Sequence, residues 1–476
     1  MSRVHFIAVG GSVMHYLAVD LARRGFVVTG SDDEIRDPAR SRLAENGILP
    51  PAEGWFPEKI TSELDFVVVG MHARADNPEL TRAQELGLTL YSFPEYVYRH
   101  AEHKQRIVVT GSHGKTTVTA MIMTMLREAG RDFDYLVGAR VPGFDGTIRL
   151  SEDAPLMVIE GDEYLCAPFD PRPKMTAYRP HIVVLTGIAW DHVNVFPTFE
   201  AYKDAFAQLL KNLCKAGVCV YFQDDPTVAE LAAAHLKKEW HYPVPYHALP
   251  YRAGSGRAAV KIEDKRVPVR VIGKHNAANF AAALAVCRKQ LAVSASACLR
   301  AVASFAGASM RIETIYRDEK NVVLRDFAHA PSKVRATLEA VRSFYREFRL
   351  VVVLELHTYS SLDKNYLPQY RNALKGVRRK IVLVDCEAAG RKRMVVPSAR
   401  EVQKAFNDRN VRVVHTLEAL EAELRTACLP AKKYLLAPSG LLPAPKKGTV
   451  VLLMSSGGLA GLSLSPQDVR SWFDKR

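Results

Sequence analysis

Residues 106–130 constrain the fold of this chain more than any other stretch, and they read RIVVTGSHGKTTVTAMIMTMLREAG. The β-branched run at 107–110 predicts a buried strand, and the apolar residues after Lys115 recur at helical spacing up to Gly130. A strand, a glycine loop and a helix in this order direct backbone N–H groups and the positive end of the helix dipole at an anion. The stretch therefore predicts a phosphate-binding loop.

Within this loop, Lys115 supplies a positive charge, and the Thr116 hydroxyl stands where P-loops hold Mg²⁺. The spacing departs from the common P-loop, because only Ser112 and His113 separate Gly111 from Gly114. The alternative is an ordinary strand-to-helix turn. We favour phosphate binding because the Gly-Lys-Thr triplet stands between a strand and a helix. The residues expected to contact the phosphates here are Gly111, Ser112, His113, Gly114, Lys115, Thr116 and Thr117, and the family resemblance given below implies that the phosphates are those of ATP.

The composition excludes several classes of protein. The length of 476 residues suggests about three domains. No apolar run is long enough to span a membrane, and the N-terminus enters a strand pattern directly, so we expect a soluble cytoplasmic protein without a membrane partner. Seven cysteines without a CxxC pair are typical of reduced, buried thiols.

The net charge of +14 favours anionic partners, which are either nucleic acids or phosphate-rich small molecules. The basic residues are scattered, with small clusters at 378–380 and 391–393, and no basic stripe contains interleaved aromatic residues. We therefore expect no nucleic-acid partner, and keep a basic nucleic-acid-dependent NTPase as a minor alternative.

The N-terminus resembles a dinucleotide-binding unit. A strand at 4–9, a loop and helix reading GGSVMHYLAVDLARRG, and a second strand ending at Asp32 form a βαβ pattern with an acid about 20 residues after the first turn. The fingerprint is incomplete, because Met14 or His15 takes the place of the third glycine. A Rossmann-like turn without a ligand is the alternative.

Acidic residues follow the predicted strand at 155–159. Glu160, Asp162 and Glu163 stand at its carboxyl end, where open α/β sheets bind ligands and where a carboxylate could complete the Mg²⁺ shell begun by Thr116. Helix N-caps are the alternative. Position favours Glu160 as the metal ligand and leaves Asp162 and Glu163 open. His192 follows the next strand, at 182–186, and is either a ligand or a structural histidine.

Further strands at 350–354, 380–384, 411–414 and 449–454 alternate with helix-like segments, which predicts a parallel sheet. A polar stretch at 97–105 lacks core periodicity and suggests a linker. The predicted fold is α/β with mostly parallel sheets and three domains, at 1–104, 105–307 and 308–476.

Several motifs resemble the Mur ligase family, which joins amino acids or peptides to a UDP-linked muramic acid. They are TGSHGKTT, the N-terminal GGSxMHxLAxxLxxxGxxVTGSD, the segment EGDEY…FDxRPKxxxYRPxxxxLxxxxxDHxxxF over 160–196, GxHNxxN, DFAHAP and MSSGGLAGL. They cover the three domains in order and are similar to the muramic acid branch. The resemblance implies a Rossmann-like N-terminal domain, a central ATPase-like domain and a Rossmann-like C-terminal domain that closes over ATP and the incoming peptide.

The resemblance also implies roles for particular residues. The UDP-sugar site would contain Gly10, Gly11, Ser12, Ser31, Asp32, His72 and Asn77, although His72 alone could be a solvated loop residue. The ATP site would extend to His275, Asn276, Asn279, Arg311, Asp326 and His329. The catalytic residues would be Lys115, Thr116, Glu160 and His192, and Mg²⁺ would be held by Thr116, Glu160 and His192.

The implied activity is an ATP-dependent amide ligase of peptidoglycan recycling, which joins L-alanyl-γ-D-glutamyl-meso-diaminopimelate to UDP-N-acetylmuramate through an acyl phosphate. Two alternatives stay open: the L-alanine-adding ligase of peptidoglycan synthesis, and a Mur-like nucleotide-binding protein without turnover. Residues 355–361, ELHTYSS, lack arginines that the family often has there. The sequence leaves the diamino acid and the choice between monomer and dimer open.

Overall fold

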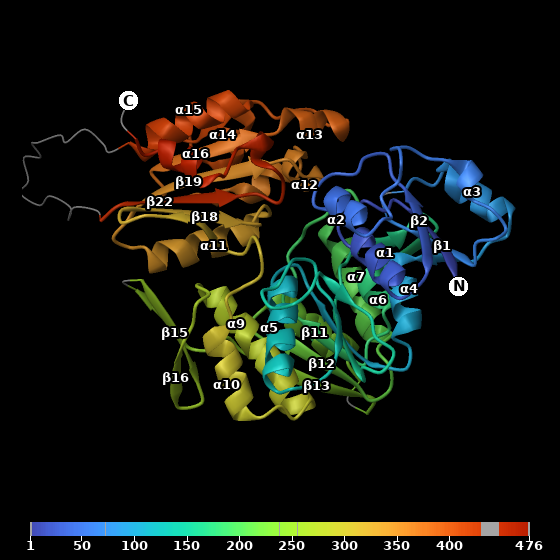
Figure 1. The fold of residues 1–476 in the computed structure, drawn as a ribbon. Coiled ribbons are helices and arrows are strands. Elements are labelled where there is room, and N and C mark those ends of the chain that lie inside the picture. Colours follow the sequence, from blue (N-terminus) through green and yellow to red (C-terminus); the bar gives the residue numbers. More distant parts are fainter. Residues whose placement is uncertain (1, 72, 238, 255, 430–446, 475–476) are drawn as a thin grey trace, which may run out of the picture. The chain divides into compact units, whose positions relative to one another are not determined.

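The structure is a computed structural model that describes residues 2–71, 73–237, 239–254, 256–429 and 447–474. It confirms an α/β fold with mostly parallel sheets (Figure 1). By its internal contacts the chain divides into two compact units. Unit 1 contains Met1–Ile188, Phe199–Ala248 and Ala278–Val302, and unit 2 contains Ala189–Thr198, Leu249–Ala277 and Ala303–Arg476.

The first sheet of unit 1 is fully parallel, in the order β2-β1-β3-β4. Its apolar strand residues, such as Ile7, Val67 and Val69, are buried because helices pack against the sheet. The elements in chain order are β1 Arg3–Ile7, α1 Met14–Arg23, β2 Val27–Ser31, α2 Ala39–Glu45, η1 Pro57–Lys59, β3 Phe66–Val69, α3 Pro78–Glu85, β4 Leu90–Ser92 and α4 Phe93–His100.

The second sheet of unit 1 has the order β13-β12-β11-β5-β8-β6-β7 and is parallel except for the β6–β7 pair. Its elements are β5 Gln105–Thr110, α5 Lys115–Glu128, β6 Asp134–Leu136, β7 Ile148–Arg149, β8 Leu156–Glu160, β11 Ile182–Leu185, α7 Phe199–Lys211, β12 Gly217–Phe222, α8 Pro226–His235 and β13 His241–Tyr246. A hairpin of β9 Leu165–Ala167 and β10 Asp170–Pro173, with α6 Lys174–Ala177, follows β8.

Strand β5 lies between β11 and β8 in this sheet, so the loops that follow these strands leave it at the same edge. Helix α5, which follows β5, is buried on every side from Thr116 to Leu126. This explains its apolar and methionine-rich composition. The strand and helix predicted at 107–130 are confirmed, with Gly130 at a positive φ of 65° just after the helix.

The polar stretch at 97–105 contains core residues, which corrects the reading that it lacks them, and the domain boundary predicted there stays a prediction. It belongs partly to α4, and Val97 and Ala101 are fully buried. Lys104 is buried as well, and its Nζ lies 2.7 Å from Oδ2 of the buried Asp134. A charged residue that is paired inside a protein looks the same in the sequence as a solvated one. The polar composition of 97–105 therefore gave no sign of burial.

Unit 2 contains a sheet in the order β17-β18-β22-β19-β20-β21, in which only β17 runs antiparallel to its neighbour. Its strands are β17 Glu313–Arg317, β18 Asn321–Asp326, β19 Arg349–Leu356, β20 Arg379–Val384, β21 Arg412–Val414 and β22 Thr449–Met454. The strands predicted at 350–354, 380–384, 411–414 and 449–454 are thereby confirmed. Its helices are α11 Pro331–Phe344, α12 Tyr359–Leu362, η3 Leu367–Tyr370, α13 Cys386–Arg391, α14 Ala399–Phe406, α15 Leu417–Cys428, η4 Leu459–Gly461 and α16 Pro466–Ser471.

A small antiparallel sheet of β14 Tyr251–Gly254, β15 Arg257–Ile262 and β16 Lys265–Pro268 also belongs to unit 2. It is followed in the chain by α9 Lys274–Leu284, the π-helical turn η2 Ala285–Gln290 and α10 Ala295–Ser304.

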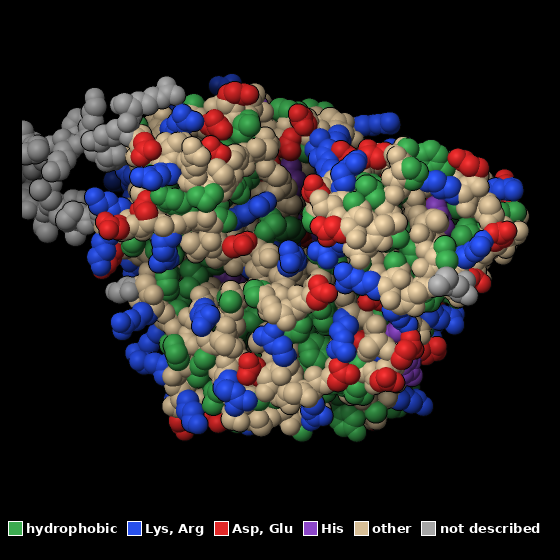
Figure 2. Space-filling model, in the orientation of Figure 1, with side chains coloured by type: hydrophobic (Ala, Val, Ile, Leu, Met, Phe, Trp, Pro, Cys, Tyr) green, Lys and Arg blue, Asp and Glu red, His purple; other side chains and the backbone are tan. Residues whose placement is uncertain are grey.

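The cysteines are free, as predicted, but not all are buried. Cys214 and Cys386 are exposed, which corrects the expectation that every thiol is a core residue. Basic and acidic side chains are interspersed over the face shown in Figure 2, in keeping with the scattered charges of the sequence. Among the described residues, no helix has the length and apolar character needed to cross a membrane.

Candidate active site

The predicted phosphate loop connects β5 to α5 and depends on its two glycines. Gly111 and Gly114 have φ values of 124° and 76°, in the region that favours glycine. Their surroundings leave no room for a side chain. A Cβ atom at Gly111 would lie 2.5 Å from Thr186 Oγ1, and one at Gly114 would lie 2.4 Å from Asn279 Oδ1. Asn279, predicted to bind ATP, therefore lies against the loop.

Lys115 begins helix α5 and points back over the loop. Its Nζ donates to the carbonyl oxygen of Gly111 at 2.8 Å and to Glu163 Oε2 at 2.6 Å. Burial by itself lowers the pKa of Lys115, but the carboxylates of Glu163 and Asp162 outweigh burial and raise the pKa above its usual value. The lysine therefore carries a fixed positive charge at the mouth of the loop.

Thr116 and Glu160 form the second contact at the loop. The Thr116 hydroxyl donates to Glu160 Oε1 at 2.8 Å, and the backbone N–H of Gly138 donates to Glu160 Oε2 at 2.6 Å. A hydroxyl and a carboxylate held together are the hard oxygen donors that Mg²⁺ prefers. The residues present thus fit the predicted ion.

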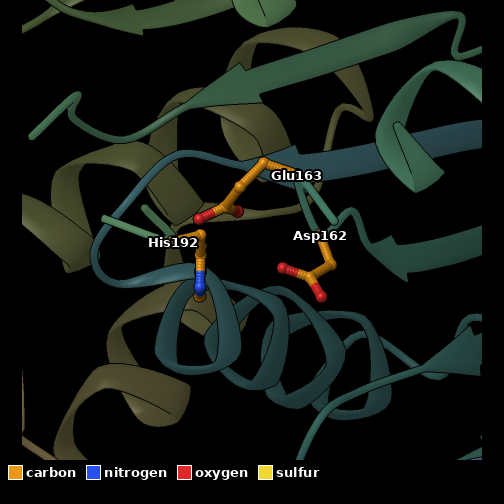
Figure 3. A group of neighbouring side chains, drawn as sticks. All are labelled: Asp162, Glu163 and His192. Carbon is orange, nitrogen blue, oxygen red and sulfur yellow. The ribbon is translucent and has the colours of Figure 1, made fainter. Parts of the chain in front are cut away.

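The sequence left the roles of Asp162 and Glu163 open, and in the structure both carboxylates lie near lysine side chains. Figure 3 shows the two carboxylates on the loop that follows β8. Asp162 Oδ2 lies 3.6 Å from Nζ of Lys174, and its Oδ1 lies 3.9 Å from Nζ of Lys115. Glu163, whose side chain is 1% exposed, pairs with Lys115 instead of capping a helix.

Tyr202 is a site residue that the sequence analysis missed. Its hydroxyl, on the buried face of α7, donates to Glu163 Oε1 at 2.8 Å and lies 2.8 Å from Ser112 Oγ. It therefore connects the loop to the carboxylate that holds Lys115. No motif marked it, because a tyrosine on an apolar helix face is usually a core residue.

The turn that follows β1 contains part of the predicted UDP-sugar site. The backbone N–H of Gly10 donates to Asp32 Oδ2 at 2.7 Å, which joins the first turn to the end of β2. Burial raises the pKa of Asp32 to about 6, while the Gly10 N–H opposes this rise and the neighbouring Asp33 adds to it. Ser12 is exposed beside this turn. The carbonyl oxygen of Gly11 lies 2.8 Å from His15 Nδ1.

Two other predicted UDP-sugar residues also serve the fold. Ser31 is fully buried, and its Oγ lies 3.4 Å from Lys59 Nζ. The side chain of Asn77 caps helix α3 by accepting the backbone N–H groups of Glu79 and Leu80 at 2.9 and 3.1 Å. His72 lies outside the described residues.

In unit 2, Asp326 at the end of β18 fixes the surrounding turns. Its Oδ2 accepts the Ile312 N–H at 2.8 Å, and its Oδ1 accepts the Ala328 N–H and the Thr337 hydroxyl, both at 2.9 Å. The guanidinium of Arg311 lies 4.6 Å from the centre of the Phe327 ring, beside this aspartate in sequence.

Asp191 connects the segment that carries His192 to the rest of unit 2. Its Oδ2 lies 3.1 Å from Lys333 Nζ and 3.8 Å from Nε2 of His329, and its Oδ1 accepts the backbone N–H of His192 at 2.9 Å. Burial raises the pKa of Asp191, but Lys333 and the neighbouring histidines outweigh burial and hold it well below its usual range. His192 itself has a left-handed φ of 57°.

The two remaining predicted ATP residues of unit 2 stand at the start of α9. Asn276 donates through Nδ2 to the carbonyl oxygen of Ile272 at 2.8 Å. Burial lowers the pKa of His275, and Asp326 and Glu339 oppose this shift, so the imidazole is neutral at pH 7.

Comparison with known proteins assigns the chain to a family. Residues 3–105 match the model "Mur ligase family, catalytic domain", and residues 109–287 match "Mur ligase middle domain". A UDP-N-acetylmuramate–L-alanine ligase of an Arthrobacter strain is 32% identical over 80% of this chain and 81% of its own length.

Solved structures agree in fold. A murein peptide ligase of Psychrobacter arcticus covers 100% of both chains with a TM-score of 0.68 at 21% identity. The UDP-N-acetylmuramate:L-alanyl-γ-D-glutamyl-meso-diaminopimelate ligase of Neisseria meningitides is 27% identical, covers 64% of this chain and 98% of its own, and has a TM-score of 0.58.

The matched family defines the class of protein, an ATP-dependent carbon–nitrogen ligase, and the glycine loop with its paired lysine fits this class. This chain belongs to the Mur ligase family, as the sequence motifs predicted.

Proposed function

We propose that this enzyme joins the tripeptide L-alanyl-γ-D-glutamyl-meso-diaminopimelate to UDP-N-acetylmuramate in an ATP-dependent reaction. The observation that carries the proposal is a pair of hydrogen bonds at the glycine loop. Lys115 donates to Glu163, and the Thr116 hydroxyl donates to Glu160. These bonds place a cation and hard oxygen donors at the N-terminus of a helix, where the phosphates of ATP would bind.

The chemistry proceeds in two steps. The lactyl carboxylate of the muramate attacks the γ-phosphorus of ATP, the bond from that phosphorus to ADP breaks, and an acyl phosphate forms. The amino group of the peptide then attacks the acyl carbon, loses a proton and expels inorganic phosphate, which leaves an amide. Both steps depend on positioning and on stabilisation of developing negative charge.

Each residue at the loop has a defined part in these steps. Lys115 and the N–H groups of 111–117 neutralise and orient the phosphates. Thr116 and Glu160 would hold Mg²⁺, with His192 as the predicted third ligand. Bound Mg²⁺ supplies additional charge neutralisation. Tyr202 and Glu163 keep Lys115 aimed at the loop.

The substrates are assigned to the predicted sites by the same proposal. Gly10, Gly11, Ser12, Ser31, Asp32, His72 and Asn77 would receive the UDP sugar. His275, Asn276, Asn279, Arg311, Asp326 and His329 would complete the ATP site around the loop.

The tripeptide is supported by the segment at 160–196 and by the likeness to the Neisseria protein, which is 27% identical. L-Alanine is the second candidate, because the Arthrobacter relative, at 32% identity, is an L-alanine ligase. Phosphate release with ATP, UDP-N-acetylmuramate and either acceptor separates them. We expect the tripeptide to give the higher kcat/KM. A higher kcat/KM for L-alanine would show that L-alanine, and not the tripeptide, is the acceptor.

Lys115→Ala tests the catalytic assignment. We expect the variant to lose ATP-dependent ligation by several orders of magnitude and to keep its affinity for UDP-N-acetylmuramate, measured by calorimetry, since the sugar site is built from other strands. Turnover close to that of the wild type would refute the role of the loop. A wild-type protein that forms no ADP with both substrates would instead be a binding protein without turnover.

A further inference from the structure

A cavity of about 160 Å³ lies within unit 1, between α1, α2 and the β6–β7 hairpin. Helices α1 and α2 pack side by side (Figure 1). None of the described residues that line the cavity is among those predicted to bind ATP or the UDP sugar. Because a cavity of about 150 Å³ accommodates a molecule of the size of benzene, this one can hold a small metabolite but not a nucleotide.

Asp20 lines this cavity from α1 without a partner. Its Oδ2 is buried and has no hydrogen-bond partner, and its carboxylate forms no ion pair, among the described residues. Burial raises the pKa of Asp20 to about 6, and the charge of Arg24 opposes this rise. The carboxylate is therefore mainly ionised at pH 7 but only partly solvated. A cationic group bound beside it would stabilise its charge.

Arg42 lines the same cavity from α2. Its guanidinium carbon lies 4.1 Å from the centre of the Tyr16 ring, which covers one face of the group. Its Nε is buried and has no hydrogen-bond partner, and the side chain forms no ion pair, within the part of the chain that the structure describes. A guanidinium held against a ring still presents its N–H edge, which binds carboxylates.

The other charged residues of the cavity already have partners. Arg23 Nη1 lies 3.4 Å from Asp145 Oδ2, and Arg149 Nη1 donates to Asp132 Oδ1 at 2.8 Å. The described lining residues thus leave one carboxylate and one guanidinium unmatched.

The rest of the wall is mainly apolar or aromatic. Val19, Tyr135 and Ile148 line the cavity and are buried. The Tyr135 hydroxyl donates to the carbonyl oxygen of Asp145 at 2.7 Å, so it needs no partner in the cavity. Such a wall suits a short apolar side chain.

We propose that this cavity binds a small zwitterionic α-amino acid, with its ammonium group on Asp20 and its carboxylate on Arg42. The two opposite charges of such a ligand match the two unmatched side chains. A simple anion would leave Asp20 without a partner, and a metal cation would leave Arg42 without one. This binding goes beyond the proposed ligase reaction and does not depend on it.

The cavity is separate from the predicted substrate sites, but one of its walls leads to the glycine loop. Asp20 lies in the second half of α1, about 9 Å along the helix from Met14, its first residue. The connection between β6 and β7 contains Gly138, whose N–H donates to Glu160 Oε2 at 2.6 Å. A ligand that fixes this hairpin would therefore act on a residue predicted to hold Mg²⁺.

Calorimetry with L-alanine tests the site, because the methyl group of L-alanine suits the apolar wall. The titration uses the full chain without ATP or UDP-N-acetylmuramate. We expect Asp20→Asn and Arg42→Met each to raise the Kd for L-alanine at least about tenfold, because each removes a charged hydrogen bond to the ligand. Arg149→Met is the matched control, since it removes a cation of the same cavity that already has a partner, and it should bind L-alanine as the wild type does. Thermal unfolding shows whether each variant is folded.

Two analogues of L-alanine assign the contacts. L-Alaninamide lacks the carboxylate, and N-acetyl-L-alanine lacks the ammonium group. The wild type should bind both more weakly than L-alanine. Arg42→Met should show no further loss for the amide, and Asp20→Asn should show none for the acetylated compound. Equal affinity for all three compounds, or inorganic phosphate bound as tightly as L-alanine, would overturn the proposal.

L-Alanine is also the second candidate acceptor of the ligase, and the variants separate the two sites. L-Alanine bound at the active site would be held equally by the wild type, Asp20→Asn and Arg42→Met. That result, or no binding of L-alanine to the wild type, would overturn the cavity site.

A kinetic experiment, which rests on the proposed function, tests the connection to Glu160. With the tripeptide as acceptor, L-alanine should change the KM for ATP in the wild type and in Arg149→Met, but not in Asp20→Asn. A change that persists in Asp20→Asn, or no change in the wild type, would overturn the connection. Failure of the ligase reaction itself would leave the calorimetric test of the cavity valid.

Discussion

The hydroxyl of Tyr202 donates to Glu163 Oε1 at 2.8 Å, and through this bond a residue of helix α7 controls the carboxylate that holds Lys115. The side chain of Tyr202 is fully buried. Its contact with Ser112 Oγ extends the connection to the loop itself. The charge of the loop lysine is thus positioned by a residue that makes no contact with the phosphates in our proposal.

We expect Tyr202→Phe to lower the free energy of unfolding by about 1 to 3 kcal/mol, because it removes the buried hydroxyl that Ser112 and Glu163 share. It should also raise the KM for ATP, since Lys115 loses its orientation. Tyr135→Phe is the control, because that buried hydroxyl donates only to the Asp145 carbonyl at 2.7 Å and lies outside the loop. Equal ATP kinetics in both variants would contradict a positioning role.

Gly114→Ala should lower both stability and ATP affinity. The new Cβ would lie 2.4 Å from Asn279 Oδ1 at a φ of 76°. Gly130→Ala, at the other end of the same helix, is the matched control, with a φ of 65° and no atom within 4 Å of the added Cβ. Both variants should lose about 1 kcal/mol from the positive φ. Only Gly114→Ala should weaken ATP binding in calorimetry, and equal affinities would argue against close packing of the loop on Asn279.

Lys333→Met tests the buried charge pair with Asp191. The pKa of Asp191 is held low in the folded protein, since burial is outweighed by Lys333 and the neighbouring histidines. For a carboxylate with a lowered folded pKa, the stabilisation is full above its unfolded value of about 3.9 and is lost as pH falls through the folded value. Removal of Lys333 takes the ammonium group away from the buried Asp191 carboxylate and should cost about 3 kcal/mol at pH 7.

Acid titration of unfolding, followed by fluorescence, gives the check on this pair. The difference in unfolding free energy between wild type and Lys333→Met should shrink as pH falls through the acid range, because Asp191 becomes neutral in both. Lys364→Met is the control, since Lys364 pairs on the surface with Glu401 at 3.0 Å and should cost less than about 1 kcal/mol. A difference that is independent of pH would show that charge is not the cause.

Asn77 has a structural role and a predicted ligand role, and two variants separate them. Asn77→Ser keeps an N-cap oxygen and should retain stability, whereas Asn77→Ala should lose about 1 kcal/mol. We expect both variants to bind UDP-N-acetylmuramate more weakly in calorimetry. Sugar affinity equal to that of the wild type in Asn77→Ser would remove Asn77 from the site and leave only the cap.

The local pattern at 105–128 was enough to predict the strand, the loop and the helix, because β-branched runs, glycines and helical spacing act over short stretches of chain. The same reasoning placed Glu160 at the end of a strand, and in the structure its carboxylate accepts the Thr116 hydroxyl there. Local patterns failed to predict that a charged residue is buried beside a partner distant in the sequence, as Lys104 is beside Asp134.

The sequence by itself thus determined the parallel α/β fold and the loop that would hold the phosphates. Only the tertiary structure decided that Glu163 and Tyr202 secure Lys115, and that Asn279 closes on Gly114. These partners come from the loop after β8, from α7 and from α9, and local spacing gives no sign that these segments are neighbours. The order of strands in the sheet brings them together, and that order depends on packing over the whole chain.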